Sequence, residues 1–406
     1  MALLENLNSN REVIISDAID HNGPTTPRAT RAEIHLEALR HNVRAIRSLL
    51  QPEVKLMAVV KADGYGHGAL PCTRAVLAAG ADCLGVGIVA EGVELRENGV
   101  QAPIQVLTGH FPNEIDDLIQ HELTATVWNS SMAKALADRA AQCDKQVGVH
   151  VKVDTGMGRL GGTSDNLPAL MEFIHHSKNL RAEGVFTHFS TADEEDSEFT
   201  TLQLERFQAT LTKINQGEIP APPAHCANSS ALLRYPESHF SMVRPGLILY
   251  GALTSKNLEP ALDKLLGSTA EKKLRPVMAW KTQILQINKI SKGSPLSYGK
   301  KFITRRDSTI ATLPVGYADG LNRALSGKMS VLIHGQRVSQ VGTICMDLCM
   351  VDVTDLPQVR AGDEVVILGR QGSEAIAVEE MADHARTIPY EILCCVGKRV
   401  PRIYIP

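Results

Sequence analysis

The sequence predicts an α/β fold: a (β/α)8 TIM barrel followed by a mostly β C-terminal domain. From about Arg31, short apolar runs alternate regularly with helix-like stretches. The alternation stops near Met278, and strand-like runs broken by Gly, Pro and Asp follow. The length of 406 residues exceeds the ~250–300 residues over which a single core usually keeps growing. These observations together favour two domains.

Eight apolar runs account for the barrel. Helix-like stretches such as NEIDDLIQHE and DSEFTTLQLERFQATLTKI lie between them. Eight strands that alternate with helices suggest a parallel barrel, and a doubly wound sheet is the rival on pattern alone. The eight runs are residues 54–61, 82–89, 104–109, 123–128, 146–154, 180–188, 222–229 and 241–251.

The second domain is expected to contain little helix, because only AVEEMADHA (377–385) has a helix-like pattern there. We place the boundary near Lys272. The expected division is a flexible N-terminal extension (1–26), the barrel (27–271) and the mostly β domain (272–406). The strand-like runs of this last part are 278–290, 307–316, 329–335, 336–342, 348–354, 363–369 and 398–405.

Composition points to work on a small molecule in the cytoplasm. A formal net charge of −3 provides no electrostatic footprint for nucleic acid or an anionic membrane. Eight cysteines without a CxxC pair are typical of reduced thiols in a cytosolic protein. The N-terminus lacks the apolar run of a signal peptide, and no later stretch approaches the ~18 apolar residues of a spanning helix. We therefore expect no nucleic-acid or membrane partner.

The ends of the predicted strands carry the chemistry, because barrel enzymes build their sites on the C-terminal face. Lys61 closes the first strand and precedes a glycine-rich stretch, 62–68. Such a lysine is either a solvated strand end or a Schiff-base amine, since a partly buried lysine loses its charge readily. Further polar residues at these ends are Lys152, Asp154, Arg159, His188, Asn228, Ser229, Arg244 and Gly246.

A second element favours the Schiff-base interpretation. Asn228 or Ser229 precedes the helical stretch 231–236 and could cap it, so that backbone N–H groups face an anion. Gly246 follows on the last strand, and barrel phosphate sites commonly lie between the loops after strands 7 and 8. A lysine together with a phosphate cradle predicts bound pyridoxal 5'-phosphate.

Nine ordered segments then resemble the successive signatures of the alanine racemase family. The resemblance runs from about Pro27 to the C-terminus and leaves only the N-terminal extension uncovered. The segments are AVVKADGYGHG (58–68), VKVDTGMGRLG (151–161), THFSTAD (187–193), HCANSS (225–230), VRPGLILYG (243–251), SYGKKF (297–302), VGYADG (315–320), GTICMD (342–347) and TIPYEI (387–392).

The resemblance implies a pyridoxal-phosphate-dependent isomerase that interconverts L- and D-alanine and supplies D-alanine for peptidoglycan. It implies that Lys61 holds the cofactor as an internal aldimine and, once displaced, acts as the base on the D-alanine face. Tyr298 is the implied base on the L-alanine face. A phenol with a pKa near ~10 needs positive charge or hydrogen bonding nearby to act so.

The remaining roles also come from the resemblance. Arg244 would bond the pyridine nitrogen, and His188 would bond Arg244. Arg159 would orient the substrate carboxylate, with the Met346 backbone N–H as second donor, and Lys152 matches a position that is carbamylated in many relatives. The implied phosphate ligands are Tyr65, Ser229, Gly246, Leu247 and Tyr390.

An obligate homodimer follows from the same resemblance, because relatives take the Tyr298 and Met346 segments from the partner subunit. No metal is expected, since no cysteine or carboxylate is spaced to complete a zinc site with His67 or with His175 and His176. The cysteines at 345, 394 and 395 are expected to be buried small residues rather than redox groups.

Departures from the family pattern leave the catalytic pair intact but affect the expected substrate channel. They are Leu321 and Asn322 after VGYADG, Thr343 and Cys395. Three alternatives stay open: a racemase for serine or basic amino acids, an amino-acid decarboxylase, and a noncatalytic pyridoxal-phosphate-binding barrel. Whether D-alanine is made for the cell wall or degraded is also open.

Overall fold

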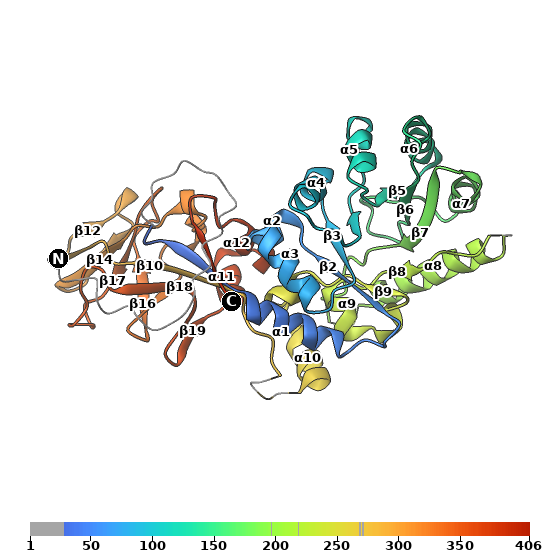
Figure 1. The fold of residues 1–406 in the computed structure, drawn as a ribbon. Helices are drawn as coiled ribbons and strands as arrows, with labels where there is room; N and C mark the ends of the chain where they lie inside the picture. Colours follow the sequence, from blue (N-terminus) through green and yellow to red (C-terminus); the bar gives the residue numbers. More distant parts are fainter. Residues whose placement is uncertain (1–27, 196, 218, 268, 270–271) are drawn as a thin grey trace. The chain divides into compact units, whose positions relative to one another are not determined.

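The computed structural model describes residues 28–195, 197–217, 219–267, 269 and 272–406. The expected extension, 1–26, lies outside the described residues. Contacts within the chain separate two compact units, drawn together in Figure 1. We call the described residues of Ala38–Pro276 with Val378–Cys395 the barrel unit, and the described residues of Met1–Glu37 with Val277–Ala377 and Val396–Pro406 the β unit.

Eight parallel strands form the barrel unit as two four-stranded sheets that join into a ring. Ladders join β9-β2-β3-β4 and β5-β6-β7-β8. A parallel bridge between Gln105 and Thr124 joins the two sets at one seam. At the other seam the Arg244 N–H donates to the Ala227 carbonyl at 2.9 Å. The strands are β2 Lys55–Val59, β3 Cys83–Val86, β4 Ile104–Val106, β5 Ala125–Val127, β6 Val147–Lys152, β7 Leu180–Phe186, β8 Ala224–His225 and β9 Met242–Val243. Each lies within a predicted run, so the barrel prediction is confirmed.

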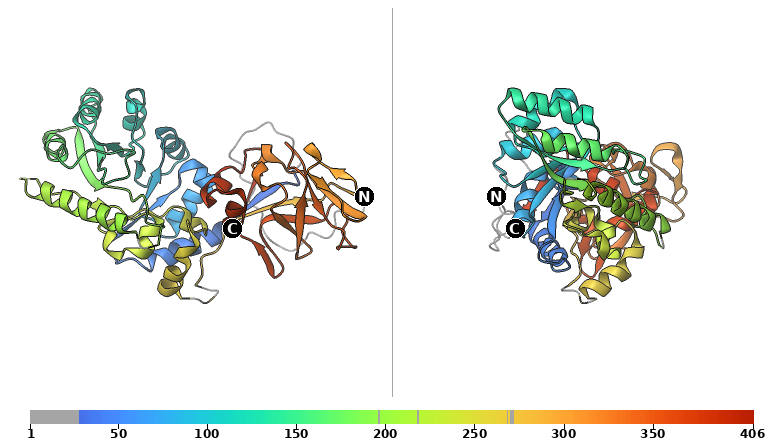
Figure 2. Two further views of the ribbon diagram at one scale, coloured as in Figure 1. Left: turned by 180° about the vertical axis from the view of Figure 1, so that it is seen from behind. Right: turned by 90° about the vertical axis from the view of Figure 1, so that its right-hand side faces the viewer.

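Helices cover the outside of this ring (Figures 1 and 2). α1 shows why: Leu39, Val43 and Ile46 recur on one face, and each is 0% exposed. Side-chain caps fix several starts, as where Asn129 accepts the Met132 N–H. The helices are α1 Leu36–Arg47, α2 Lys61–Gly66, α3 Ala69–Ala78, α4 Val89–Glu97, α5 Ile115–Gln120, α6 Ser130–Gln142, α7 Leu167–His176, α8 Glu198–Asn215, α9 Ser229–Arg234, α10 Glu259–Leu266, α11 Val378–Ala385 and α12 Pro389–Cys394.

The β unit is built on one sheet with the order β11-β14-β17-β16-β15-β18-β10-β1-β20, and β19 pairs with β18. Its pairs are antiparallel except that β1 runs parallel to β20. A two-stranded sheet of β12 and β13 stands apart. The strands are β1 Arg31–His35, β10 Met278–Gln283, β11 Gln286–Ile290, β12 Pro295–Leu296, β13 Phe302–Ile303, β14 Ser308–Leu313, β15 Ser330–Ile333, β16 Gln336–Val341, β17 Cys349–Asp352, β18 Glu364–Gln371, β19 Glu374–Ile376 and β20 Arg402–Ile405.

Both units have apolar cores that follow from their sequence patterns. In the barrel unit Leu56, Leu84 and Ile104 are fully buried, as expected for parallel strands covered by helices. In the β unit Trp280 and Leu332 are fully buried on the sheet. None of the helices in the described part is long and apolar enough to cross a membrane.

Candidate active site

A cavity of about 310 Å³ lies in the barrel unit. Most of its walls come from residues at or just after the carboxyl ends of the strands, the face on which barrel enzymes build their sites, and Ile388 and Tyr390 come from the start of α12. Nine of the residues predicted from the sequence line it: Lys61, Tyr65, Lys152, Arg159, His188, Ser229, Arg244, Gly246 and Tyr390. Leu247 comes directly after Gly246 and is fully buried.

Lys61 opens an unusual left-handed turn. Ala62, Asp63, Gly64 and Tyr65 all have φ between 52° and 60°, a region that costs non-glycine residues about 1–2 kcal/mol each. Carboxylates hold the turn in place: Glu91 accepts the Ala62 N–H at 2.7 Å, and Asp63 accepts the Ala69 N–H at 2.7 Å. The predicted glycine loop is thus a strained turn that fixes Lys61 and Tyr65.

The environment of Lys61 favours a neutral amine. Burial lowers its pKa, and the positive charge of Arg159 lowers it further, while Glu91 and Cys394 oppose the shift. Glu91 also accepts the Gly87 N–H at 2.6 Å, so its carboxylate is committed to the backbone around the lysine. A lysine with a lowered pKa is a better nucleophile toward a carbonyl.

Ser229, Gly246 and Tyr65 form a compact polar cradle. Asn228 caps α9 by accepting the Ala231 N–H at 2.9 Å, and the Ser229 hydroxyl accepts the Gly246 N–H at 3.0 Å. A Cβ at position 246 would lie 2.4 Å from the Tyr65 hydroxyl. Only glycine at position 246 therefore leaves room for the Tyr65 hydroxyl beside this loop. The polar groups gathered there suit an anion.

Two tyrosines complete this side of the cavity. The rings of Tyr65 and Tyr390 lie 5.7 Å apart between centroids. Burial raises the pKa of Tyr65, with a smaller contribution from Tyr390. Burial likewise raises the pKa of Tyr390. Both hydroxyls stay protonated and can donate hydrogen bonds to a bound anion.

Arg244 is buried at the end of β9, where it donates to carbonyls and a ring nitrogen. Its Nη1 lies 2.7 Å from His225 Nδ1, and its Nη2 donates to the Thr187 carbonyl at 2.8 Å. His188 Nδ1 lies 3.4 Å from the same Nη2. Burial lowers the pKa of Arg244 to about 10, so the guanidinium stays charged at neutral pH. His225 is thus the nearer histidine partner.

Lys152 lies on β6 with its side chain among cations and aromatic carbon. Its Nζ is 4.6 Å from the centroid of the Phe186 ring. Burial lowers the pKa of Lys152 to about 7, helped by the charges of Arg244 and Arg159. This amine therefore loses its proton far more readily than an exposed lysine does. Arg159 is exposed to the cavity and has no ion-pair partner among the described residues.

Tyr298 and Met346 belong to the β unit, where they lie on neighbouring segments. Tyr298 follows Ser297, whose hydroxyl donates to the Thr343 carbonyl at 2.6 Å. The Thr343 hydroxyl donates back to the Tyr298 carbonyl at 3.0 Å. Their side chains are open: the exposed fraction is 72% for Tyr298 and 53% for Met346.

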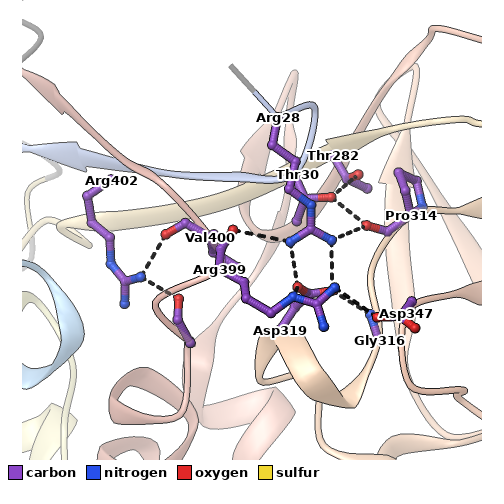
Figure 3. A network of polar contacts seen from close by, with 11 residues as sticks. Arg28, Thr30, Thr282, Pro314, Gly316, Asp319, Asp347, Arg399, Val400 and Arg402 are labelled. Atoms are coloured by element: carbon purple, nitrogen blue, oxygen red, sulfur yellow. Dashed lines mark hydrogen bonds and ion pairs between the residues drawn. The ribbon is translucent and has the colours of Figure 1, made fainter. Parts of the chain in front are cut away.

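A buried carboxylate anchors the loop beside Met346 (Figure 3). Asp319 is fully buried and contacts Arg28 through both oxygens, at 2.5 and 3.0 Å. Arg399 lies 3.5 Å from the same carboxylate. In the anchored loop the Ala318 N–H donates to the Met346 carbonyl at 3.0 Å. This network ties three distant parts of the chain together around the Met346 segment.

Four residues that surround the turn after Lys61, Lys152 or Arg244 were not predicted from the sequence: Glu91, Phe186, His150 and His225. His225 is the first residue of the HCANSS segment, so the sequence placed it near the site. A histidine inside a strand is equally typical of a core residue whose ring nitrogens are hydrogen-bonded. No group of three or more metal-binding side chains occurs among the described residues. All eight cysteines are free, and the expectation that those at 345, 394 and 395 are buried is wrong, because Cys345 is half-buried and Cys394 and Cys395 are exposed.

The fold and the cavity define a class of protein: a parallel barrel with a partly buried lysine beside an anion cradle, continued in one chain by a mostly β domain. The chain belongs to the alanine racemase family. The family model of the alanine racemase N-terminal domain matches residues 34–254, and that of the C-terminal domain matches residues 277–404.

Individual relatives agree over nearly the whole chain. The alanine racemase of Desulforamulus reducens is 44% identical over 376 residues, which cover 92% of this chain and 98% of the relative. That of Halothermothrix orenii is 41% identical over 93% of this chain and 97% of its own. The alanine racemase structure from E. faecalis has a TM-score of 0.85 at 34% identity, covering 93% of this chain and 98% of the other. The structure from the D-cycloserine producing Streptomyces lavendulae has a TM-score of 0.86 at 35% identity, with 94% and 98% covered.

Proposed function

We propose that this protein is an alanine racemase that interconverts L- and D-alanine with pyridoxal 5'-phosphate bound at Lys61. One observation carries the proposal: a lysine whose pKa is lowered shares a cavity of about 310 Å³ with an anion cradle. The family membership supports it, because the relatives carry the name alanine racemase.

The cavity fits this cofactor at three points. The Lys61 amine suits the aldehyde, and the Arg244 guanidinium suits the pyridine nitrogen, which it would keep unprotonated because arginine does not give up its proton. When bound, pyridoxal phosphate supplies an electron sink for the charge that develops at the substrate Cα. The phosphate would be held by Tyr65, Ser229, Gly246, Leu247 and Tyr390.

The substrate carboxylate has a ready partner in Arg159. This guanidinium faces the cavity and is not used in an ion pair among the described residues, so it can form a bidentate contact with a carboxylate. The Met346 N–H is the proposed second donor. Lys152 would steady Arg159 as a carbamate, and a pKa of about 7 provides the neutral amine that carbamylation requires.

Racemisation needs a proton to leave one face of Cα and return to the other. We assign these transfers to two bases, the Lys61 amine on the D-alanine face and the Tyr298 phenolate on the L-alanine face. The positive charge of Arg159 beside the reacting centre would favour ionisation of the phenol.

The two bases would come from different subunits of a homodimer. Tyr298 and Met346 are exposed together with Leu348 and Tyr317 of the same unit, and exposed apolar side chains of this kind are typical of protein interfaces. A second copy of the chain is the proposed occupant, with each site completed across the interface. We place the reaction in the cytoplasm, where the eight free cysteines would stay reduced, and assign the D-alanine to peptidoglycan synthesis.

The test is turnover of purified protein reconstituted with pyridoxal phosphate. We expect D-alanine to form from L-alanine, and we expect alanine to be preferred over serine, lysine and arginine. Lys61→Ala should lose both activity and the visible absorbance of bound cofactor, whereas Tyr298→Phe should lose activity but keep that absorbance. Release of carbon dioxide would indicate a decarboxylase instead. Cofactor binding without any racemisation would indicate a noncatalytic barrel.

A further inference from the structure

A chain of hydrogen bonds runs from Arg244 into the centre of the barrel. Arg244 Nη1 lies 2.7 Å from His225 Nδ1. The other nitrogen of that ring, Nε2, lies 2.7 Å from Nδ1 of His150. All three side chains are buried. His150 was not singled out by the sequence, and the two-base reaction described above assigns it no role.

The direction of this chain follows from chemistry. A guanidinium has only donors, so His225 Nδ1 accepts from Arg244. A neutral His225 then carries its proton on Nε2 and donates it to His150 Nδ1. Burial, and next to it the charge of Arg244, lowers the pKa of both histidines, to about 3 for His150. Both rings are thus neutral, and each has a single tautomer, with the proton on Nε2.

The barrel makes room for His150 in a specific way. A Cβ at position 184 would lie 2.6 Å from the His150 ring, so only glycine fits on the adjacent strand. The pairing of β6 and β7 shifts register between Val149 and His150, as at a β-bulge that redirects a side chain. His225 is held as firmly, because its ring stacks on Phe186 at 4.9 Å with 3° between the planes.

The far end of this chain of hydrogen bonds, at His150, lies outside the catalytic cavity. His150 lines a second cavity, of about 790 Å³, together with Lys55, Met57 and Gln105. Lys55 opens β2 and Val147 opens β6, so this cavity lies at the amino-terminal end of the strands. Among the described residues His150 Nε2 has no protein partner, and water in this cavity can accept a hydrogen bond from its N–H.

We propose that His150 is a positioning residue for the racemase. His150 accepts a hydrogen bond from the Nε2–H of His225 and so holds that ring in the tautomer whose Nδ1 accepts from Arg244. The held ring in turn fixes Arg244 where the pyridine nitrogen of the cofactor would lie. The inference rests on the proposed function and adds a residue to it. The arrangement resembles the orientation of a catalytic imidazole by a buried acceptor.

The first test compares two substitutions of one residue. His150→Leu removes the acceptor, whereas His150→Asn keeps an amide oxygen near the position of Nδ1. In cofactor-free protein labelled with 15N-histidine, His225→Asn identifies the His225 signals. These should show one Nε2-protonated tautomer in wild type and His150→Asn. In His150→Leu the buried Nε2–H loses its acceptor, so the ring can turn away from Arg244 and the signals should show a mixture of tautomers. In the loaded enzyme, kcat should fall about tenfold in His150→Leu, the size typical of losing a histidine's orienting partner, with KM for alanine nearly unchanged because Arg159 is not involved. His150→Asn should retain most of kcat.

The second test displaces the His150 ring without altering it. Gly184→Ala places a methyl group against the imidazole, and its matched control is Gly148→Ala, whose Cβ has the carboxylate of Glu183 as its nearest neighbour. Neither glycine has a positive φ, so alanine suits both backbones. We expect Gly184→Ala to reproduce the tautomer mixture and the loss of kcat, and Gly148→Ala to match wild type. This pair keeps the proposal testable if His150→Leu fails to fold.

The two proposals fail in different ways. If wild type racemises alanine but His150→Leu and Gly184→Ala keep a single His225 tautomer and wild-type kcat, the role of His150 is wrong and the racemase remains. If His150→Leu and His150→Asn lose activity equally, packing rather than the hydrogen bond matters, and the proposal is also wrong. If wild type shows no racemisation, the function itself is wrong, while the tautomer measurement still reports on the chain of hydrogen bonds.

Discussion

Lys152 illustrates how one buried cation makes stability depend on pH. Its pKa is about 7 in the folded chain, against 10.5 for an ordinary lysine. Between these values the unfolded chain holds one proton more than the folded chain, so stability rises with pH through this window. Below pH 7 both states are charged, and the full cost of burying the ammonium is present.

We therefore predict that Lys152→Met stabilises the protein at pH 6 and that the gain shrinks as pH rises toward 10. The size follows from ~1.4 kcal/mol for each pH unit through which the two states differ by a proton, which amounts to a few kcal/mol. Chemical denaturation in carbon-dioxide-free buffer at several pH values measures it. Lys55→Met is the control, since Lys55 is exposed at the start of β2. An equal gain at pH 6 and pH 10 would contradict the assignment.

At the level of residues, the sequence predicted the contents of the cavity better than their connections. Lys61, Arg159 and Arg244 could be found because they stand at strand ends or within family segments. The link from Arg244 through His225 to His150 could not, because it joins β9, β8 and β6 across the barrel. Alternation along a single strand shows only that such a histidine faces inward.

At the level of elements, the left-handed turn after β2 has a measurable cost. Ala62 adopts φ of 52°, where its Cβ is unfavourable and glycine is not. We predict that Ala62→Gly raises the free energy of unfolding by up to about 1 kcal/mol, because it relieves this strain. Denaturant unfolding measures the change. Ala135→Gly, at an exposed position within α6, should instead lower the free energy of unfolding by about 1 kcal/mol. A loss of stability in both variants would show that the turn is not strained at Ala62.

The elements themselves were predicted to different degrees. Long apolar runs gave all eight barrel strands, because parallel strands buried on both faces are continuously apolar. The run 241–251 is a strand only at Met242–Val243, and Leu247–Tyr250 turn into a short 3-10 helix around the cradle. β1, RAEIH, contains no apolar run, and its parallel partner β20 lies at the other end of the sequence. No local pattern therefore indicates this strand. The turn of Ala62–Tyr65 was not predictable either, because tertiary contacts impose it.

At the level of the whole molecule, the network around Asp319 joins the start and the end of the described chain. Arg28 precedes β1, Arg399 precedes β20, and Asp319 lies in the loop that packs on Met346 (Figure 3). We predict that Asp319→Asn destabilises the β unit by about 1–3 kcal/mol, because it removes the charge-assisted hydrogen bonds that a fully buried carboxylate accepts from Arg28. Thermal unfolding measures the loss. Asp355→Asn, which removes an exposed pair with Arg306, should leave stability almost unchanged. Equal effects of the two substitutions would show that burial of Asp319 contributes nothing.

Shared active sites make a prediction that only the assembled molecule can test. Lys61→Ala and Tyr298→Phe homodimers should each be nearly inactive. If each site takes its lysine from one subunit and its tyrosine from the other, a mixed dimer contains one site with both native residues and one site with neither. Random exchange of subunits in an equal mixture gives mixed dimers for about half of the molecules, so activity should recover to about a quarter of the wild-type value. The measurement is racemisation before and after exchange under mild denaturant. A site built within one chain always lacks one base in such a mixture and recovers nothing, so the amount regained distinguishes the two arrangements directly.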